Sequence, residues 1–343
     1  MKGSLEDNWD SLLRLFPHES YDLYFEEKYL RLYETEDNKA VCFVYTEDKN
    51  IFLFPFLRRK FLYKGDLYFD FETAYGYGGP ILNNNNEHFA TRAFKAMYNY
   101  CAKNNYIAGF IRFHPLLNNY KGYQAIGNLI LDRQTIAIDL TLSNEDIWMK
   151  EIHTKNRSTI KNAIKSGLKF VVDREYNYLN EFFKLYENTM KKLNADAFYS
   201  FHYDYYNMFK KTINNSYLGV VLNNDKVISA AIFFYSRDYG HYHLSGSDPD
   251  YLNMNPNNFL IYESSKVMKL LGVKKFHLGG GINSDEQNPL YRFKKKFSKN
   301  KYDFYIGKSI FNHKIYDLLC NDWILMNKSK ELIYKNYLLK YKF

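Results

Sequence analysis

Residues 217–247, YLGVVLNNDKVISAAIFFYSRDYGHYHLSGS, contain three apolar stretches separated by short polar turns. The runs 217–223, 225–236 and 240–247 are rich in residues that favour strands, and the polar turn between the first two predicts a hairpin. The apolar spacing then predicts a helix at 257–271 and another strand at 273–279. This stretch therefore predicts a unit made of a hairpin, a third strand, a helix and a fourth strand.

The first half of the chain repeats this order of elements with almost no identity of residues. Its expected strands lie at 40–46, 50–58, 67–71 and 107–113, and its expected helix lies at 87–103. A repeated pattern of this size indicates a duplicated α+β domain. We expect one domain at 1–142 and a second at 143–343, each a mixed sheet flanked by helices.

Composition excludes several classes of protein. The chain has 343 residues, 46% of them apolar, which is enough to bury a core. Cys42, Cys101 and Cys320 are far apart in sequence, so neither a disulfide framework nor a zinc site is expected, and no metal is called for. No stretch has the length of a signal peptide core or a membrane span. We expect a cytoplasmic protein, with the inner face of the membrane as an alternative site of action.

The positive charge is concentrated at the end of the chain. Residues 291–343 hold 13 basic and 4 acidic residues, a balance of +9 that equals the net charge of the whole chain. Such a segment suits RNA, phosphate-rich ligands or an anionic membrane surface. The ordinary alternative is a solvated, lysine-rich helix, which we expect at 314–340.

Several motifs resemble those of the Fem-type peptidyltransferases and their BioF-like acyltransferase relatives, which carry two tandem GNAT-like units. The resemblance extends from about residue 70 to residue 310. The matching segments are YGYGGP (75–80), RFHP (112–115), NRSTIKNAIKSGLKF (156–170), YHLSGS (242–247), NPNNFLIYESSK (255–266), FHLGGG (276–281) and LYRFKKKFS (290–298).

The resemblance implies an acyltransferase of the cell envelope, with no bound cofactor. It would move an aminoacyl group from aminoacyl-tRNA, or an acyl group from acyl-CoA, to an amine on a peptidoglycan peptide or an amino-sugar glycan. The amine would attack directly, without a covalent intermediate. Its partners would be a nucleotide- or lipid-linked precursor, tRNA and, peripherally, the membrane.

Two departures from the family pattern bear on the donor. The glycine-rich loop that holds the CoA pyrophosphate is missing, which favours aminoacyl-tRNA. The charged coiled-coil insertion of some Fem enzymes is also missing, which favours acyl-CoA. The non-enzymatic alternative is a protein that binds RNA or a membrane surface through residues 291–343.

Two residues are candidates for catalysis. Lys294 corresponds to the lysine of the family's Phe-Lys pair and is expected near the LGGG strand end, where a cation can hold a phosphate or a developing negative charge. His243 is a candidate base, and strand alternation predicts that His241, His243 and Ser245 share a face. Asp248 and Glu187 are alternative bases. The ordinary readings are a surface lysine and a buried histidine.

The remaining candidates would bind substrates. The strand-end loop YGYGGP is expected to line an acceptor cleft, beside a cation that clamps a phosphate or carboxylate. A basic helix face that also includes Lys165 is expected to meet the donor. Tight turns, ion pairs, caps and a solvated lysine stripe are the structural alternatives. The acceptor candidates are Tyr75, Tyr77, Gly78, Gly79 and Arg112; the donor candidates are Arg157, Lys161, Tyr199, Ser245, Asn258, Gly279 and Gly280.

Overall fold

The computed structural model describes residues 3–84, 86–193 and 201–343. The chain divides into two compact units, Met1–Asp132 with Asp303–Phe343, and Arg133–Tyr302. None of the helices that the structure describes has the length and apolar content of a membrane-spanning segment.

The first unit is a sheet with the strand order β1-β2-β3-β4-β6-β13, and β5 pairs with β3. Its neighbouring strands are antiparallel, except that β4 and β6 are parallel. The strands are β1 (Ser4–Glu6), β2 (Asn38–Glu47), β3 (Asn50–Tyr63), β4 (Asp66–Glu72), β5 (Ile81–Leu82), β6 (Tyr106–Arg112) and β13 (Lys301–Ile310). The helices are α1 (Asp10–Leu13), α2 (Glu27–Arg31), α3 (Glu87–Lys103), α10 (His313–Met326) and α11 (Glu331–Tyr334).

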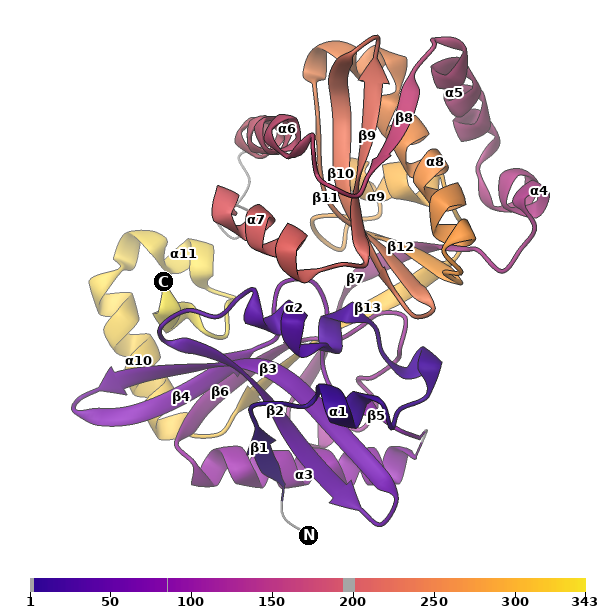
Figure 1. The fold of residues 1–343 in the computed structure, drawn as a ribbon. Coiled ribbons are helices and arrows are strands. Elements are labelled where there is room, and N and C mark those ends of the chain that lie inside the picture. Colours follow the sequence, from indigo (N-terminus) through magenta and orange to yellow (C-terminus); the bar gives the residue numbers. More distant parts are fainter. Residues whose placement is uncertain (1–2, 85, 194–200) are drawn as a thin grey trace. The chain divides into compact units, whose positions relative to one another are not determined.

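Helices cover both faces of this sheet (Figure 1). On one face, α3 buries Phe94 and Met97 in an aromatic core with Phe52 and Phe54 of β3. On the other face, α2 lies against β2 and β3, and α10 lies against β6. Because side chains alternate along a strand, each strand supplies apolar residues to both layers.

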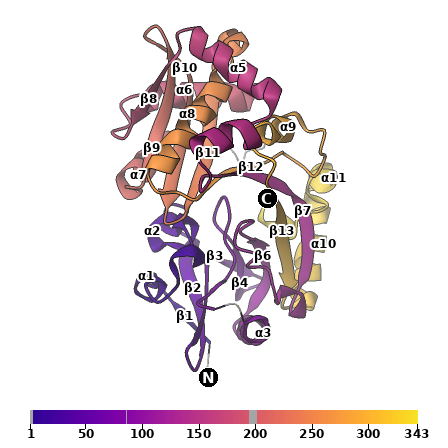
Figure 2. The ribbon, with the colours of Figure 1, turned by 90° about the vertical axis from the view of Figure 1, so that its right-hand side faces the viewer.

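The second unit is a sheet with the strand order β7-β12-β11-β10-β9-β8, in which only β11 and β12 are parallel. The strands are β7 (Asn128–Asp139), β8 (Lys169–Asp173), β9 (Ser216–Asn223), β10 (Lys226–Ser236), β11 (Tyr239–Ser247) and β12 (Lys275–Gly280). The helices are α4 (Asn144–Asp146), which runs into a π-helical turn (Ile147–Glu151), α5 (Thr154–Lys165), α6 (Leu179–Lys192), α7 (Tyr203–Thr212), α8 (Pro256–Leu270) and α9 (Pro289–Lys295). Figure 2 shows α5 packed beside α8.

The division of the chain differs from the expected boundary at residues 142 and 143. The limits of the two units fall inside β7 and β13, so the chain crosses from one unit to the other within these two strands. Residues Ile306–Ile310 of β13 pair with β6, which places the basic C-terminal segment in the first unit. A pattern along one chain does not reveal that the last strand of the first sheet follows the second unit.

Two helices that the sequence predicts have different bounds in the structure. The apolar spacing of Leu5, Trp9, Leu12, Leu13 and Phe16 predicts one helix over 5–16, but this stretch begins within β1, which pairs with β2, and continues to the short α1. The expected helix at 314–340 ends at Met326, after which the chain folds back so that Leu338 and Leu339 pack with Leu319. The hydroxyl of Tyr316 donates to the carbonyl of Leu338 at 2.8 Å and holds this return.

The YHLSGS motif has a packing role in the second unit. The backbone of α6 lies directly on β11 at Gly246, where a Cβ atom would be 2.4 Å from the carbonyl carbon of Leu185 and the amide nitrogen of Tyr186. Only glycine allows a helix backbone to approach a strand this closely.

We therefore expect Gly246→Ala to lower the free energy of unfolding by about 1–3 kcal/mol, because α6 must move off the sheet. Urea unfolding followed by circular dichroism measures this change. Ser284→Ala, on an exposed loop, is the control and should unfold like the wild type. An unchanged midpoint for Gly246→Ala would contradict the close packing of α6 on β11.

Candidate active site

The parallel strands β11 and β12 separate in the middle of the second sheet. They pair at Tyr239 with Lys275, Gly240 with Phe276 and His241 with His277. Both strands then continue, to Ser247 and Gly280, with no further ladder pairing between them along residues that the structure describes. Among the described residues, backbone N–H and C=O groups beyond these three positions are thus not used in a ladder between β11 and β12.

Lys294 lies at the end of this opening. Its helix, α9, begins at Asn288, whose side-chain oxygen accepts from the amides of Leu290 at 3.1 Å and Tyr291 at 3.3 Å. Lys294 is only 8% exposed, and its Nζ donates to the carbonyl of Gly280 at 2.8 Å. The short helix therefore fixes the amine against the last residue of β12.

The surroundings of Lys294 favour its neutral form. Burial, assisted by the positive charge of Arg133, lowers the pKa of Lys294 to about 7. The Arg133 guanidinium donates to the carbonyl of Gly281 at 2.8 Å, next to the carbonyl that Lys294 binds. Near neutral pH this amine can accept a proton, and in its charged form it can stabilise an oxyanion.

The glycines of LGGG bring the chain's own segments together around Lys294. Gly279 has a φ of +78°, in the left-handed region that favours glycine, next to a bulge in β12. A Cβ on Gly280 would be 2.7 Å from the carbonyl oxygen of Gln134, and one on Gly281 would be 2.8 Å from Oδ1 of Asn288. These close approaches join β12 to β7 and α9, which explains the motif without an acyl group beside it.

A bulge in β11 corrects the expected arrangement of His241, His243 and Ser245. Leu244 pairs with Ile232 of β10, whereas Tyr242 pairs with the next residue, Phe233, so His243 is the extra residue. The register puts Ser245 on the face of Tyr242, opposite His241. The prediction of a shared face is therefore confirmed for His241 and His243, whose rings both contact Phe234, and wrong for Ser245, because simple alternation fails across a bulge.

The surroundings of His243 do not suit a general base. Its ring stacks on Phe209, and its Nε2 is 3.1 Å from the hydroxyl of Tyr205. Burial, together with the nearby His241, lowers the pKa of His243 to about 3. A group this weakly basic is a poor proton acceptor at neutral pH, so Lys294 fits the role better.

The other candidate bases have partners. Asp248 forms an ion pair with Lys226 at 2.9 Å, and Glu187 lies 4.0 Å from Lys191. Burial raises the pKa of Asp248, but the bonds from Lys226 and the Asp250 amide outweigh burial, so the net pKa is lowered. Asp248 therefore holds its charge and serves as an ion-pair partner.

The expected donor-binding residues have structural contacts on α5 and α8. Arg157 donates to the carbonyls of Trp148, Met149 and Ile152 and so closes the π-helical turn. Asn258 donates to Asn156 and joins α8 to α5.

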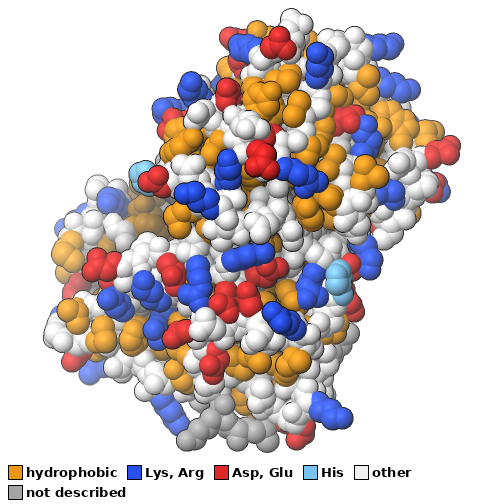
Figure 3. All heavy atoms as spheres, viewed as in Figure 1, with side chains coloured by type: hydrophobic (Ala, Val, Ile, Leu, Met, Phe, Trp, Pro, Cys, Tyr) orange, Lys and Arg blue, Asp and Glu red, His pale blue; other side chains and the backbone are white. Residues whose placement is uncertain are grey.

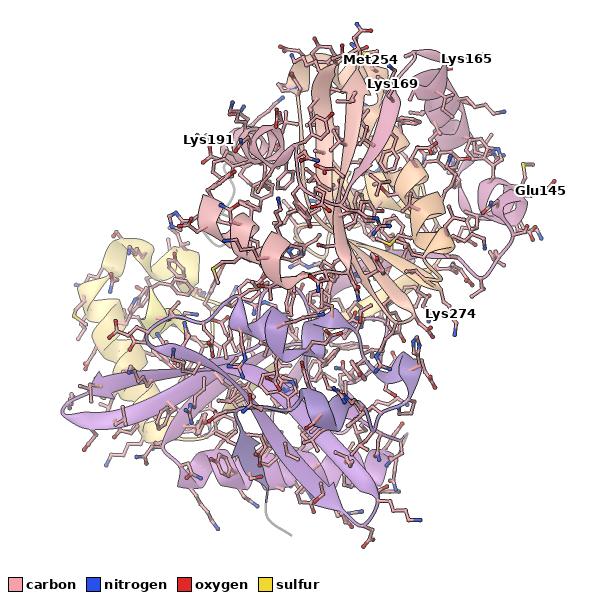
Figure 4. All side chains as sticks on the ribbon, in the orientation of Figure 1. Glu145, Lys165, Lys169, Lys191, Met254 and Lys274 are labelled. Atoms are coloured by element: carbon pink, nitrogen blue, oxygen red, sulfur yellow. The ribbon has the colours of Figure 1, made fainter. Side chains whose placement is uncertain are left out.

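The rest of the basic face of α5 is open to solvent. Lys161 lies 5.9 Å from the ring centroid of Trp148, and Lys165 lies at the outer end of the helix (Figure 4). Tyr199, another donor candidate, lies outside the described residues.

In the first unit, the YGYGGP loop fills the place that corresponds to the opening. Beyond the ladder of β4 and β6, the amide of Thr73 donates to Phe110 at 3.1 Å, and the amide of Gly78 donates to Arg112 at 2.7 Å. Buried Asn119 donates to the carbonyls of Gly78 and Pro80, at 2.8 Å each. These bonds extend the connection between the two strands beyond their ladder, whereas the described residues of β11 and β12 form no ladder pair beyond His241 and His277.

The acceptor candidates are part of this closure. Gly78 and Gly79 are buried, while Tyr75 and Tyr77 are half-buried; the Tyr77 ring packs on Tyr24 at 5.6 Å between centroids. The carbonyl of Tyr75 accepts from the hydroxyl of Tyr29 at 2.8 Å. The loop is thus packed into its own unit.

Arg112 forms a structural ion pair with Glu72. Its guanidinium donates to Glu72 at 3.3 Å and to the carbonyl of Thr73 at 2.9 Å. Lys342 also pairs with Glu72. Burial raises the pKa of Glu72, but the two cations outweigh it, so the pKa is lowered. These contacts fit the ion-pair alternative to a phosphate clamp.

Sequence reasoning missed the residues that surround Lys294. Arg133 and Gln134 come from β7, and Gln134 accepts from the hydroxyl of Tyr291 at 3.1 Å. Nothing in the local sequence marks Arg133 and Gln134, because they meet α9 only through sheet pairing. The capping role of Asn288 could be predicted from the sequence, because Asn-Pro before an apolar run is a helix-start signal.

Comparisons with known proteins agree with this geometry. Residues 154–295 match the family model described as an acetyltransferase (GNAT) domain. The structure is similar to FemX, with a TM-score of 0.69 and 14% identity over 93% of this chain and 99% of that one. A search by sequence found no similar protein with a curated function.

Two further structures are similar over most of both chains. One is the C-terminal domain of an Agrobacterium fabrum protein described as a lysylphosphatidylglycerol synthetase, with a TM-score of 0.55, 14% identity and 95% of each chain covered. The other is a tandem GNAT protein from the clavulanic acid pathway, with a TM-score of 0.51, 9% identity, and coverage of 90% and 98%. The tandem GNAT fold is therefore confirmed, the resemblance to Fem-type proteins holds for the fold, and the second unit contains a GNAT acyltransferase domain.

The buried amine makes a prediction about stability. An unfolded lysine has a pKa of about 10.4, so between pH 7 and 10 the unfolded chain holds a proton that folded Lys294 releases. Stability therefore rises with pH in this window, and the cost of burying the charge is largest below pH 7. Lys294→Met should raise the urea midpoint relative to the wild type most at low pH, and this gain should shrink as pH rises from about 7 toward 10.

Lys295→Met is the matched control, because Lys295 is the exposed neighbour on the same helix. Its difference from the wild type should stay constant over this range. A constant difference for Lys294→Met as well would contradict a depressed pKa.

Proposed function

We propose that the chain transfers an aminoacyl group to an amine of a cell-envelope precursor, in the opening between β11 and β12, with Lys294 as the proton acceptor. The observation that carries the proposal is the burial of Lys294 against the carbonyl of Gly280 at the end of β12. This places an amine that is partly neutral at physiological pH at the end of β12, beyond the last ladder pair that the described residues of β11 and β12 make with each other.

The reaction needs no covalent intermediate. The acceptor's amine nitrogen attacks the donor's carbonyl carbon, a carbon–nitrogen bond forms, and the ester bond to the donor's hydroxyl oxygen breaks. The proton that the amine loses passes to Lys294 and then to the leaving oxygen. Backbone amides on the diverging edges are suited to stabilise the oxyanion. The chain's main contribution is to align and desolvate the reactants.

The segment before α8 supports an aminoacyl donor over acyl-CoA. A 3₁₀ turn, Pro249–Met254, follows Asp248, and Asn255 takes a φ of +58° before Pro256 begins the helix. This segment lacks the glycines of a pyrophosphate-binding loop and carries two carboxylates, Asp248 and Asp250, where such a loop offers backbone N–H groups. The similarity to a tandem GNAT protein described without its AcCoA keeps acyl-CoA as the second candidate donor.

We describe the acceptor by its chemical class, an envelope molecule that carries a free amine. The Fem-type resemblance supports a precursor peptide that carries a free amine. The similarity to a protein described as a lysylphosphatidylglycerol synthetase supports an acceptor attached to a lipid. Both are envelope molecules, and a nucleotide- or lipid-linked precursor fits both.

Lys294→Met should lower kcat by about 100-fold or more with little change in KM, since general-base catalysis contributes about that much. In the wild type, kcat/KM should rise as pH passes through about 7, and this limb should be lost in the variant. Lys295→Met should keep both the rate and the profile.

Two results would contradict this role. A wild-type rate that falls as pH rises through 7 would mean that charged Lys294 acts as an oxyanion stabiliser instead. Unchanged turnover in a folded Lys294→Met variant would remove the residue from the mechanism.

Donor and acceptor can be tested together in cells with and without the gene. Mass spectrometry of nucleotide- and lipid-linked precursors should show the loss of one amino-acid residue's mass without the gene. Loss of an acetyl or longer acyl mass from a sugar would contradict the aminoacyl donor. If no precursor or glycan changes, the binding-protein alternative gains support.

A further inference from the structure

The last segment of the first unit exposes large aliphatic side chains. Leu325 and Met326 at the end of α10 are 69% and 76% exposed, and Leu332 and Ile333 of α11 are 86% and 64% exposed. Hydrophobic side chains are visible at the left edge of Figure 3, where α11 lies. Single exposed leucines are common, but four within nine residues form a patch that calls for a partner.

Lysines surround these side chains. Lys328, Lys330 and Lys335 are exposed, and Glu331 is the only acidic residue between Lys328 and Phe343. We call the four aliphatic side chains with these three lysines the C-terminal patch.

The patch is held in place by the rest of the unit. At the tip of the hairpin between β3 and β4, the Tyr63 hydroxyl donates to Asp322 of α10 at 2.6 Å, and Lys64 lies 3.8 Å from the same carboxylate. Leu325 and Met326 follow Asp322 by three and four residues, so they share its side of the helix. Lys64 adds another cation beside the patch.

Aromatic residues border the patch as well. The Phe343 ring stacks on Tyr334 with 4.6 Å between centroids and contacts Tyr337 edge-on at 5.7 Å. Phe343 and Tyr337 are close to half exposed. Amphipathic and aromatic rings at such a border suit the boundary between water and lipid.

These features favour a membrane over RNA. Lysines attract phosphate in either partner, but exposed leucine, isoleucine and methionine gain nothing from a nucleic-acid backbone, which is bound by cations and by aromatic stacking on bases. An anionic bilayer satisfies both kinds of side chain, since aliphatic groups enter the headgroup boundary while lysines bind the headgroups.

We propose that the C-terminal patch docks the protein on an anionic membrane surface. This goes beyond the proposed function, and binding to vesicles does not depend on catalysis. If the proposed function also holds, docking would keep the enzyme at the surface that carries lipid-linked acceptors.

Vesicle flotation with the full chain tests the proposal. The wild type should float with vesicles of phosphatidylcholine containing about one third phosphatidylglycerol and stay behind with pure phosphatidylcholine. Leu332→Asp with Ile333→Asp should weaken this binding about tenfold or more, because two aliphatic groups leave the lipid boundary. Leu270→Asp, an 88% exposed leucine of the other unit, is the matched control and should bind like the wild type.

Charge reversal provides the second arm. Lys328→Glu with Lys330→Glu should abolish flotation, whereas Lys165→Glu with Lys191→Glu, two exposed lysines of the second unit (Figure 4), should not. Circular dichroism checks that each variant is folded. The aliphatic variants should keep the fold, because the side chains that they replace are exposed.

Three results would overturn the proposal. The first is a wild type that does not float with anionic vesicles. The second is tRNA binding that the lysine variants lose and the aliphatic variants keep, with no vesicle binding. The third is a concentration-dependent dimer in sedimentation velocity that Leu332→Asp with Ile333→Asp dissociates, which would make the occupant a second copy.

Discussion

The separation of two parallel strands after only three paired positions governs the second unit. Within a sheet, a strand normally gives its backbone groups to both neighbours. Beyond His241 and His277, the described residues of β11 and β12 form no further ladder with each other. The glycines at the end of β12 allow β7 and α9 to approach this strand end closely, and α9 returns Lys294 to the carbonyl of Gly280. The opening, the buried amine and its shifted pKa are thus parts of one arrangement.

In the first unit, the YGYGGP loop lies at the corresponding place, beyond the ladder of β4 and β6. There, Thr73, Gly78 and Asn119 tie the YGYGGP loop across the gap between β4 and β6. Arg112, at the end of β6, is held by Glu72. The two units therefore differ at this place: hydrogen bonds continue beyond the ladder of β4 and β6, whereas the described residues of β11 and β12 show no further ladder pairing. In this account, the acyl transfer takes place in the second unit, and the first unit is left to bind and position the protein's partners.

The sequence predicted most strands and the duplication, because periodic apolar runs are local signals. The resemblance singled out Lys294, and its expected place near the end of the LGGG strand is confirmed by its bond to Gly280. The sequence-based predictions are wrong where the structure depends on pairing between strands that are far apart in the chain. The bulge at His243 moves Ser245 to the other face. Arg133 reaches α9 through a strand whose partner lies about 140 residues away. The place of 303–343 in the first unit follows from β13 pairing with β6. None of these contacts leaves a pattern within a single segment.

A crystal structure with a stable donor analogue tests the central claim most directly, with an aminoacyl-RNA amide and a ketone analogue of acyl-CoA that keeps the carbonyl each soaked separately. The account predicts that the acyl carbonyl lies between β11 and β12, within hydrogen-bonding distance of Lys294. A donor seated instead between β4 and β6, or one that leaves Lys294 bound only to Gly280 and remote from the carbonyl, would contradict it.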